Sequence, residues 1–173
     1  MKFVADSHDP IPRSLILGLG TAGKDFCARL KLKAPINQLE KFNIDGIDSY
    51  ANGYDSTDFD KTYVIKRIDE ASRVLIVLFG GGESASEIAK FVVFHVHRRK
   101  LFLDVILSTP MMWEGKKRAR KAAELVEYLR GAGARINVID GEIHNDPEQT
   151  DYKILFDQID KKMLEAVSLY CVT

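Results

Sequence analysis

Short continuous runs of apolar residues alternate along this chain with longer segments in which apolar residues recur every three or four positions. The short runs predict strands at 14–17, 42–47, 73–79, 101–107 and 134–139. The periodic segments predict helices at 24–33, 84–99, 114–130 and 151–170. Because the strand runs are apolar on both faces, they are typical of a parallel sheet covered by helices on both sides. The sequence therefore predicts an α/β fold: a three-layer, Rossmann-like, mostly parallel sheet with helices on both faces, ending in a long helix.

The remaining segments are more polar. Residues 1–13 include two prolines and predict a flexible lead-in, so we expect a single domain over 14–173. Residues 48–60 are rich in Asp, Ser, Asn and Gly, which predicts a loop. Residues 63–71 fit either a short strand or a helical turn.

The composition narrows the functional classes. The 173 residues are 46% hydrophobic, and 25 Lys and Arg balance 25 Asp and Glu. Because a nucleic-acid binder normally carries excess positive charge, we expect no nucleic-acid partner. No apolar run is long enough for a transmembrane segment, and the N-terminus carries charge before a signal-peptide core could form. Two cysteines, Cys27 and Cys171, cannot build a disulfide framework or a zinc site, so we expect a cytoplasmic protein without metal ligands.

The first glycine-rich segment reads G-x-G-x-x-G between a predicted strand and a predicted helix. Glycines let the backbone approach an anion closely, and a helix N-terminus offers free N–H groups and a partial positive charge. The alternative is a tight turn without a ligand. The candidate anion-binding residues here are Gly18, Gly20, Thr21, Ala22, Gly23 and Lys24.

A second glycine segment also lies between a predicted strand and a helix, and consists of Gly80, Gly81 and Gly82. Consecutive glycines cost backbone entropy, and a second anion-facing loop is the simplest reason for them. An ordinary dinucleotide-binding domain has no such second loop. Glu83 and Ser84 follow directly and join the candidate site. In the alternative, a serine of this segment, Ser84 or Ser86, caps the helix.

A third segment follows the strand at 101–107, where Pro110 turns the chain and a helix is expected to begin near Glu114. Glu114 and Arg118 are four residues apart, so both would project from one helix face. They form either a plain ion pair worth a few tenths of a kcal/mol, or a pair in which Glu114 accepts a hydrogen bond from a sugar hydroxyl and Arg118 donates one to a phosphate. The basic run at 116–121 is most simply a solvated helix face.

In this order and spacing, the segments resemble the N-terminal nucleotide-binding (GTPase) domain of the tubulin/FtsZ superfamily, most closely its FtsZ branch. The likeness extends over roughly residues 14–172. Residues 18–23 and Arg29 match the family's phosphate loop, and the triple glycine matches the start of its G-G-G-T-G-T-G signature. Residues 110–118 are similar to P-F-x-F-E-G-x-x-R, and residues 155–160 to A-F-x-x-A-D on the family's central helix.

The resemblance implies a site for GTP or GDP, with the need for Mg²⁺ left open. Glu114 would hold the ribose, and Arg118 would lie near the sugar and phosphates. Phe156 would stack on guanine, and Asp160 would accept hydrogen bonds from the base edge. Asp25 stands where the family often has an Asn that touches guanine. In the alternative, Asp160 is an exposed helix residue and Phe156 belongs to the core.

Departures from the family pattern imply weaker binding. Residues 83–86 read Glu-Ser-Ala-Ser instead of T-G-T-G, and Asp48 adds a second acid where the family has N-T-D. A phosphate about 4 Å from Glu83 would be repelled by about 1 kcal/mol in water and about 4 kcal/mol at a partly buried site. Lys24 would offset some of this repulsion. Gly141 aligns with a base-contacting Asn. We therefore expect weakened or altered nucleotide binding: a diphosphate, a monophosphate or none.

The chain also stops at the family's central helix. The resemblance then implies that the second domain, whose aspartates position water on a neighbouring subunit's nucleotide, has no counterpart. We expect weak GTPase activity at most, and no catalysis by this chain alone. The protein would act by associating with itself or with a filament-forming FtsZ/tubulin-like relative, in cell division or the cytoskeleton.

Two other hypotheses stay open. An NAD(P)-binding Rossmann-type oxidoreductase would use the G-x-G-x-x-G turn, with Asp45 or Asp48 holding a ribose. It leaves the second glycine loop and the pair of Glu114 and Arg118 unexplained. The other hypothesis is a ligand-free structural interaction module with a vestigial pocket.

Overall fold

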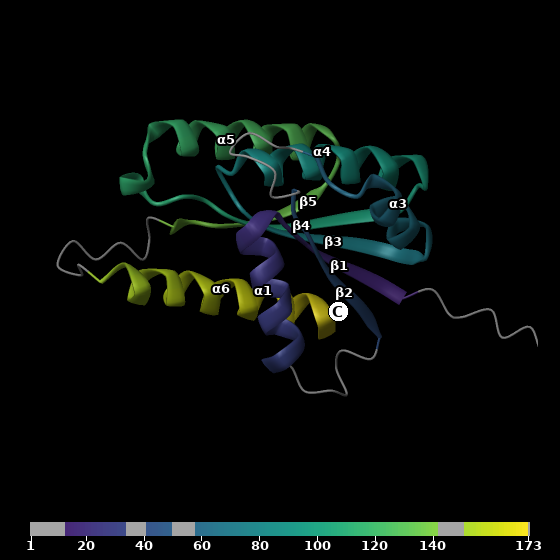
Figure 1. The fold of residues 1–173 in the computed structure, drawn as a ribbon, viewed down its shortest axis with the longest axis horizontal. Helices are drawn as coiled ribbons and strands as arrows, with labels where there is room; N and C mark the ends of the chain where they lie inside the picture. Colours follow the sequence, from purple (N-terminus) through teal and green to yellow (C-terminus); the bar gives the residue numbers. More distant parts are fainter. Residues whose placement is uncertain (1–12, 34–40, 50–57, 142–150, 173) are drawn as a thin grey trace, which may run out of the picture.

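The computed structural model describes residues 13–33, 41–49, 58–141 and 151–172, and these form one sheet with helices on both faces (Figure 1). All five strands are parallel and lie in the order β2-β1-β3-β4-β5. Their bounds are β1 Arg13–Leu19, β2 Phe42–Ile47, β3 Ala71–Phe79, β4 Phe102–Ser108 and β5 Arg135–Ile139. The predicted parallel sheet is therefore confirmed.

The helices form two layers. On one face of the sheet lie α1 (Gly20–Lys33) and α6 (Tyr152–Val172), and on the other lie α3 (Lys61–Asp69), α4 (Glu83–Arg98) and α5 (Lys116–Gly131) (Figure 1). This is the three-layer α/β fold that the sequence predicts, including the long final helix. No helix in the described ranges is long and apolar enough to cross a membrane.

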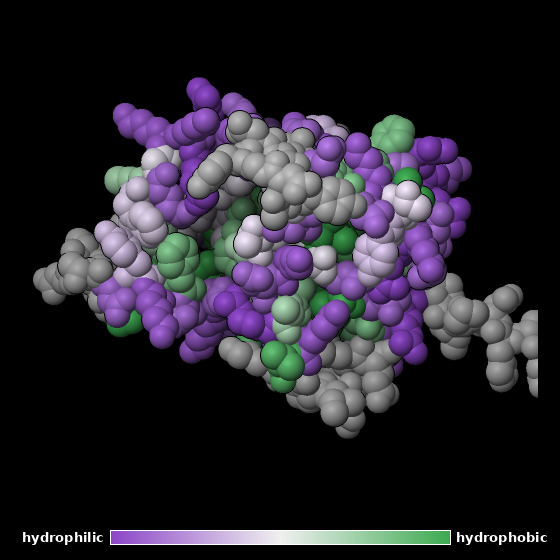
Figure 2. Space-filling model, in the orientation of Figure 1, coloured by the Kyte–Doolittle hydropathy of each residue, from purple (hydrophilic) through white to green (hydrophobic). Residues whose placement is uncertain are grey.

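Two hydrophobic cores explain why the strands are apolar throughout. Leu15 and Leu17 pack toward α3, α4 and α5, whereas Ile16 between them packs toward α1 and α6. All three side chains are 0% exposed. Because successive strand residues point to opposite faces, a sheet covered on both sides needs apolar residues at every position. On the face seen in Figure 2, hydrophilic side chains cover most of the surface and apolar atoms show mainly in gaps between them.

The ambiguous segment at 63–71 is mainly helical. Asp60 caps α3, since its Oδ1 accepts a hydrogen bond of 2.9 Å from the Tyr63 N–H. Val64 and Ile68, four residues apart, are fully buried. A spacing of four residues between two buried positions fits one face of a helix and also one face of a strand, so the sequence pattern alone was ambiguous.

Helix α1 begins at Gly20, four residues before the predicted start at residue 24. Gly20 has a φ of 73°, which turns the chain out of β1, and the first helical turn is made of the glycine loop itself. That turn contains no large apolar side chain, so the periodicity could not reveal it. The predicted lead-in at 1–13 lies outside the described residues except for Arg13, which begins β1. Most of the predicted loop at 48–60, residues 50–57, also lies outside them.

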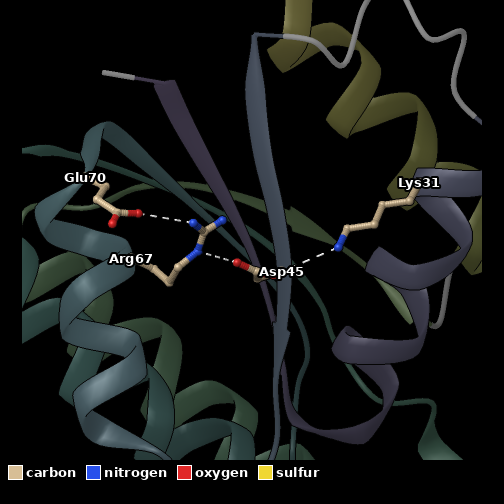
Figure 3. Close-up of polar contacts among 4 residues, drawn as sticks. All are labelled: Lys31, Asp45, Arg67 and Glu70. Carbon is tan, nitrogen blue, oxygen red and sulfur yellow. Dashed lines mark hydrogen bonds and ion pairs between the residues drawn. The ribbon is translucent and has the colours of Figure 1, made fainter. Parts of the chain in front are cut away.

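Edge strand β2 is tied to a helix on each face by charged side chains (Figure 3). Asp45 on β2 accepts a hydrogen bond of 2.5 Å from Arg67 Nε on α3. Its other carboxylate oxygen lies 3.9 Å from Lys31 Nζ on α1, and Arg67 also pairs with Glu70 at 3.2 Å. One carboxylate therefore joins both helical layers at the edge of the sheet.

Candidate functional site

A cleft of about 490 Å³ opens at the carboxyl ends of the strands, where ligands bind in open parallel sheets. It is lined by the ends of β1, β3 and β4, the first turns of α1 and α4, the segment before α5 and one side of α6. Twelve of the seventeen candidate residues line it: Gly20, Thr21, Ala22, Asp25, Gly80, Gly82, Glu83, Ser84, Glu114, Arg118, Phe156 and Asp160. Segments distant in the sequence are thus brought together.

Three of the predicted glycines do not line the cleft, because they serve internal packing. A Cβ on Gly18 would lie 2.0 Å from the Gly23 carbonyl oxygen, and a Cβ on Gly23 would lie 2.9 Å from the Val77 oxygen. These two glycines let α1 approach β1 and β3. Gly81, with a φ of 90°, lies against Arg118, whose Cβ and carbonyl oxygen would both be 2.9 Å from an added Cβ.

The triple glycine therefore has a structural explanation at two of its positions. Gly80 packs against Ala122 and the Ser108 carbonyl oxygen, both 2.9 Å from an added Cβ, and Gly81 packs against α5. Only Gly82 has room, since its added Cβ would meet nothing closer than Ala85 Cβ at 3.8 Å. Close packing therefore accounts for Gly80 and Gly81, and an anion-facing role is needed only for Gly82.

Lys24 also lies outside the cleft. Its aliphatic stem covers Gly46 of β2, where an added Cβ would lie 2.5 Å from Lys24 Cγ. Thr21 and Asp25 of the same helix line the cleft, whereas Lys24 does not. The predicted compensation of Glu83 by Lys24 therefore has no support in the geometry.

Asp48 joins the two glycine loops behind the cleft wall. Its Oδ2 accepts a hydrogen bond of 2.8 Å from Thr21 Oγ1, and its Oδ1 accepts one of 3.3 Å from Ser84 Oγ. The Ser49 N–H donates a third bond, of 2.8 Å. A hydroxyl from each loop is therefore directed at a carboxylate of the protein.

The serines after the triple glycine do not cap α4. The N-cap residue is Gly82, without a side-chain hydrogen bond. Ser86 Oγ donates a hydrogen bond of 2.9 Å back to the Gly82 carbonyl oxygen, and Ser84 Oγ donates to Asp48. The capping alternative is wrong, because both hydroxyls act as donors to other groups.

Glu114 and Arg118 are in contact, but not through one helix. A 3-10 turn, η1 (Met112–Glu114), ends at Glu114, and Gly115 with a φ of 99° separates it from α5. Glu114 Oε1 still accepts a hydrogen bond of 2.8 Å from Arg118 Nη1, and Oε2 accepts one of 2.8 Å from the Met111 N–H. Both oxygens of this carboxylate are thus engaged, and the predicted helix start at residue 114 is wrong by two residues.

At the other end of the cleft, α1 meets α6. Arg29 Nη2 lies 2.7 Å from Asp160 Oδ2, and both residues line the cleft. Phe156, one turn before Asp160, is 42% exposed and is not part of the core, contrary to the alternative interpretation. The Trp113 ring lies 5.8 Å from Phe156 and 4.6 Å from Tyr152 between ring centroids, which forms an aromatic group beside the cleft.

Nine lining residues were not among the candidate site residues, although Arg29 and Pro110 belong to segments that match the family. Leu19, Phe79 and Ser108 are the ends of β1, β3 and β4, and Thr109 and Pro110 follow β4. Ala85 lies on α4, and Asp157 and Ile159 lie on α6. The signal was available for the strand ends, because the last residues of neighbouring parallel strands must lie at one edge. At Gly141, which aligns with the family's Asn, an added Cβ would lie 2.5 Å from the Thr109 carbonyl oxygen, so no such side chain fits.

The cleft has an excess of negative charge. Its described lining contains five carboxylates, from Asp25, Glu83, Glu114, Asp157 and Asp160, and the guanidinium groups of Arg29 and Arg118. Glu83 also lies 3.2 Å from Lys121, which is outside the cleft. Phosphate groups would therefore enter a region of opposing potential.

No protein-family model and no curated protein sequence matches this chain. Several solved structures match this chain in fold. An empty FtsZ dimer from M. jannaschii matches with a TM-score of 0.71 at 20% identity, over 92% of this chain and 54% of that chain. A CetZ from Methanosaeta thermophila matches with a TM-score of 0.69 at 13% identity, over 92% of this chain and 54% of that chain. CetZ2 from Haloferax volcanii, in a GTPγS-bound protofilament, matches with a TM-score of 0.67 at 16% identity, over 92% of this chain and 58% of that chain.

The protein therefore has the fold shared by FtsZ and CetZ, and the predicted resemblance to the tubulin/FtsZ superfamily is confirmed for the fold. The chain spans about half the length of these structures. The oxidoreductase hypothesis loses one ribose candidate, because Asp45 is engaged by Arg67 and Lys31 instead of facing the cleft. Within the described residues, no group of three His, Cys, Asp or Glu could hold a metal ion.

Proposed function

We propose that this protein binds a guanine nucleotide, GTP or GDP, in the cleft at the carboxyl ends of the strands, with reduced affinity. The observation that carries the proposal is the convergence of four sequence segments on one cleft. Its volume of about 490 Å³ lies within the usual range of roughly 300–1,000 Å³ for small-molecule sites. One structural neighbour, CetZ2, is described with GTPγS bound.

Each predicted role has a residue in a suitable place. Phe156 offers a partly exposed ring for stacking, and Asp160 can accept from the base edge if Arg29 gives up part of their ion pair. Glu114 supplies an acceptor for the ribose, and Arg118 beside it supplies a donor for a phosphate. The reduced affinity follows from Asp25 and Glu83, two carboxylates that line the cleft beside the glycine loops and would repel a phosphate.

We further propose that the chain acts by association and does not hydrolyse nucleotide on its own. The partner would be a second copy or a filament-forming FtsZ/tubulin-like relative, in the cytoplasm, with a role in cell division or the cytoskeleton. Two neighbours are described as a dimer and as a protofilament.

Titration calorimetry with guanine and adenine nucleotides tests the binding. We expect saturable heat with guanine nucleotides, and a loss of about tenfold in affinity for Phe156→Ala, because stacking on an aromatic side chain contributes about 1–3 kcal/mol per base. Phe94→Ala is the matched control, since Phe94 is an exposed aromatic residue on α4 outside the cleft. Absence of heat at millimolar concentrations of every guanine nucleotide would contradict the proposal.

A ligand-free interaction module is the second candidate, favoured by the hydrogen bonds of Asp48. Because Thr21 and Ser84 already have an acceptor, the two loops are stable without an anion. Sedimentation of the protein with and without guanine nucleotide separates the two functions. Association that needs no nucleotide and does not change when it is added would support the module.

A further inference from the structure

We propose that Asp48 takes the place of a terminal phosphate, so that the cleft binds a guanine nucleoside or nucleoside monophosphate more tightly than the di- and triphosphate. This inference rests on the proposed guanine site and specifies its ligand. The idea comes from one juxtaposition: a carboxylate beside the cleft receives hydroxyl hydrogen bonds from Thr21 and Ser84, which both line the cleft.

The hydrogen bonds of Asp48 are those that a bound phosphate would need. Thr21 belongs to the first turn of α1 and Ser84 to the first turn of α4, and both residues line the cleft. Their hydroxyls donate to Asp48 at 2.8 and 3.3 Å. A phosphate oxygen at this place would have to replace Asp48 as acceptor, and the displaced carboxylate would lose its partners.

Helix dipoles lead to the same conclusion. The N-termini of α1 and α4 both point toward this end of the cleft, and a helix N-terminus favours a nearby negative charge. Asp48 already supplies that charge, bound to the first turn of each helix. A phosphate would therefore gain less from the two helix ends than it does in a site without an internal carboxylate.

Neighbouring acids extend the region that repels phosphate. Thr21, Asp25 and Arg29 follow one another at four-residue spacing along α1, and all three line the cleft. Asp25 thus lies one turn from the Asp48 contact. Glu83 begins α4 beside Ser84. Three carboxylates surround the place where a second and a third phosphate would lie.

Arg118 is the cation of the cleft that lies beside Glu114. Of the described residues that line the cleft, Arg29 and Arg118 are the cations, and Arg29 is paired with Asp160 at the opposite end. Arg118 pairs with Glu114, and its side chain is 55% exposed. A monophosphate attached to a ribose at Glu114 would reach Arg118 without approaching Asp48.

The test is a series of ligands that differ only in phosphate number. The protein is titrated with guanosine, GMP, GDP and GTP in buffer without divalent cations, by calorimetry and by the fluorescence of its single tryptophan, Trp113, beside Phe156. We expect guanosine and GMP to bind most tightly, and affinity to fall by about tenfold with each further phosphate, because each meets at least one carboxylate.

Asp48→Asn keeps the shape of the side chain and removes its charge. We expect this variant to bind GTP about tenfold more tightly than the wild type, with little change for GMP. Glu83→Gln, at an exposed position, should act in the same direction, and loss of its ion pair with Lys121 should lower stability only slightly, because surface ion pairs contribute little. Glu87→Gln is the matched control, since Glu87 lies one turn further along α4, pairs with Lys90 and does not line the cleft.

The outcomes separate the two proposals. If wild-type protein binds GTP more tightly than GMP, the inference is overturned while the guanine site stands. If the ratio of GTP affinity to GMP affinity is the same in the wild type, Asp48→Asn and Glu83→Gln, the role of the carboxylates is overturned. If no member of the series binds, the guanine site itself is wrong, and the inference fails with it.

Discussion

At the scale of single residues, the buried thiol of Cys27 should make the folded protein less stable at alkaline pH. Its thiol is 1% exposed in α1, and burial raises its pKa from 9.0 to about 12. The unfolded chain therefore loses this proton between about pH 9 and 12 while the folded protein keeps it. Stability from this group is fully present below pH 9, and the free energy of unfolding should fall by about 1.4 kcal/mol per pH unit above it.

Urea unfolding at about pH 8 and about pH 10 measures this effect. Cys27→Ala should lose the part of the pH dependence that comes from the thiol, although its stability at neutral pH also falls because a buried group is removed. Cys171→Ala is the comparison: burial also raises the pKa of this half-buried thiol on α6, but by less, so its removal should change the pH dependence less. An unchanged pH dependence in Cys27→Ala would show that its thiol ionises equally in both states.

The glycines of the two glycine-rich loops differ in how closely other atoms surround them, and substitution by alanine can test this difference. An added Cβ at Gly23 would lie 2.9 Å from the Val77 carbonyl oxygen, a backbone atom that cannot move aside easily. Gly23→Ala should therefore destabilise the fold by about 1–3 kcal/mol. Gly82→Ala should cost less, about 0.5–1 kcal/mol, because its added Cβ makes only ordinary contact at 3.8 Å and the loss comes from the N-cap position, where Ala is less favourable than Gly. Chemical denaturation compares the two, and equal losses would contradict the division into packing and cleft-facing glycines.

At the scale of elements, Asp45 holds edge strand β2 between α1 and α3. The Asp45 and Arg67 side chains are 18% and 20% exposed, so removing the carboxylate leaves a partly buried guanidinium without this partner. Asp45→Ala should cost about 1–3 kcal/mol of unfolding free energy. Asp69→Ala, which breaks an exposed pair with Arg99, should cost less than about 1 kcal/mol. Equal losses in thermal unfolding would show that the Asp45 contacts do not stabilise the sheet edge.

Sequence reasoning succeeded where local chemistry and order along the chain decide the structure. The alternation of strands and helices requires a parallel sheet, and parallel strands bring residues such as Gly20, Gly82 and Arg118 to one edge. It failed where a contact joins distant segments. No local pattern could show that Asp48 would bind both Thr21 and Ser84.

Local patterns also failed at one break between two turns. The sequence predicted a continuous helix from residue 114, because Glu114 and Arg118 are four residues apart. Gly115, with a φ of 99°, instead separates the 3-10 turn that ends at Glu114 from α5. The contact between these two side chains was predicted for the wrong reason. A close pair at four-residue spacing does not prove a helix when a glycine lies between the two residues.

At the scale of the whole molecule, the cleft joins the two helical layers. Its walls come from α1 and α6 on one face of the sheet and from α4 and α5 on the other, so a ligand in the cleft contacts both layers at once. Binding to the folded state alone raises stability by RT ln(1 + [L]/Kd), or about 2.7 kcal/mol when the ligand is at about 100 times its Kd. GMP should therefore raise the melting temperature, and it should slow hydrogen exchange at the first turns of α1, α4 and α6 together. AMP at the same concentration, and GMP with Phe156→Ala, should give much smaller shifts. Protection confined to one layer would mean that the ligand binds elsewhere, since a molecule held between Arg118 and Phe156 must contact elements on both faces of the sheet.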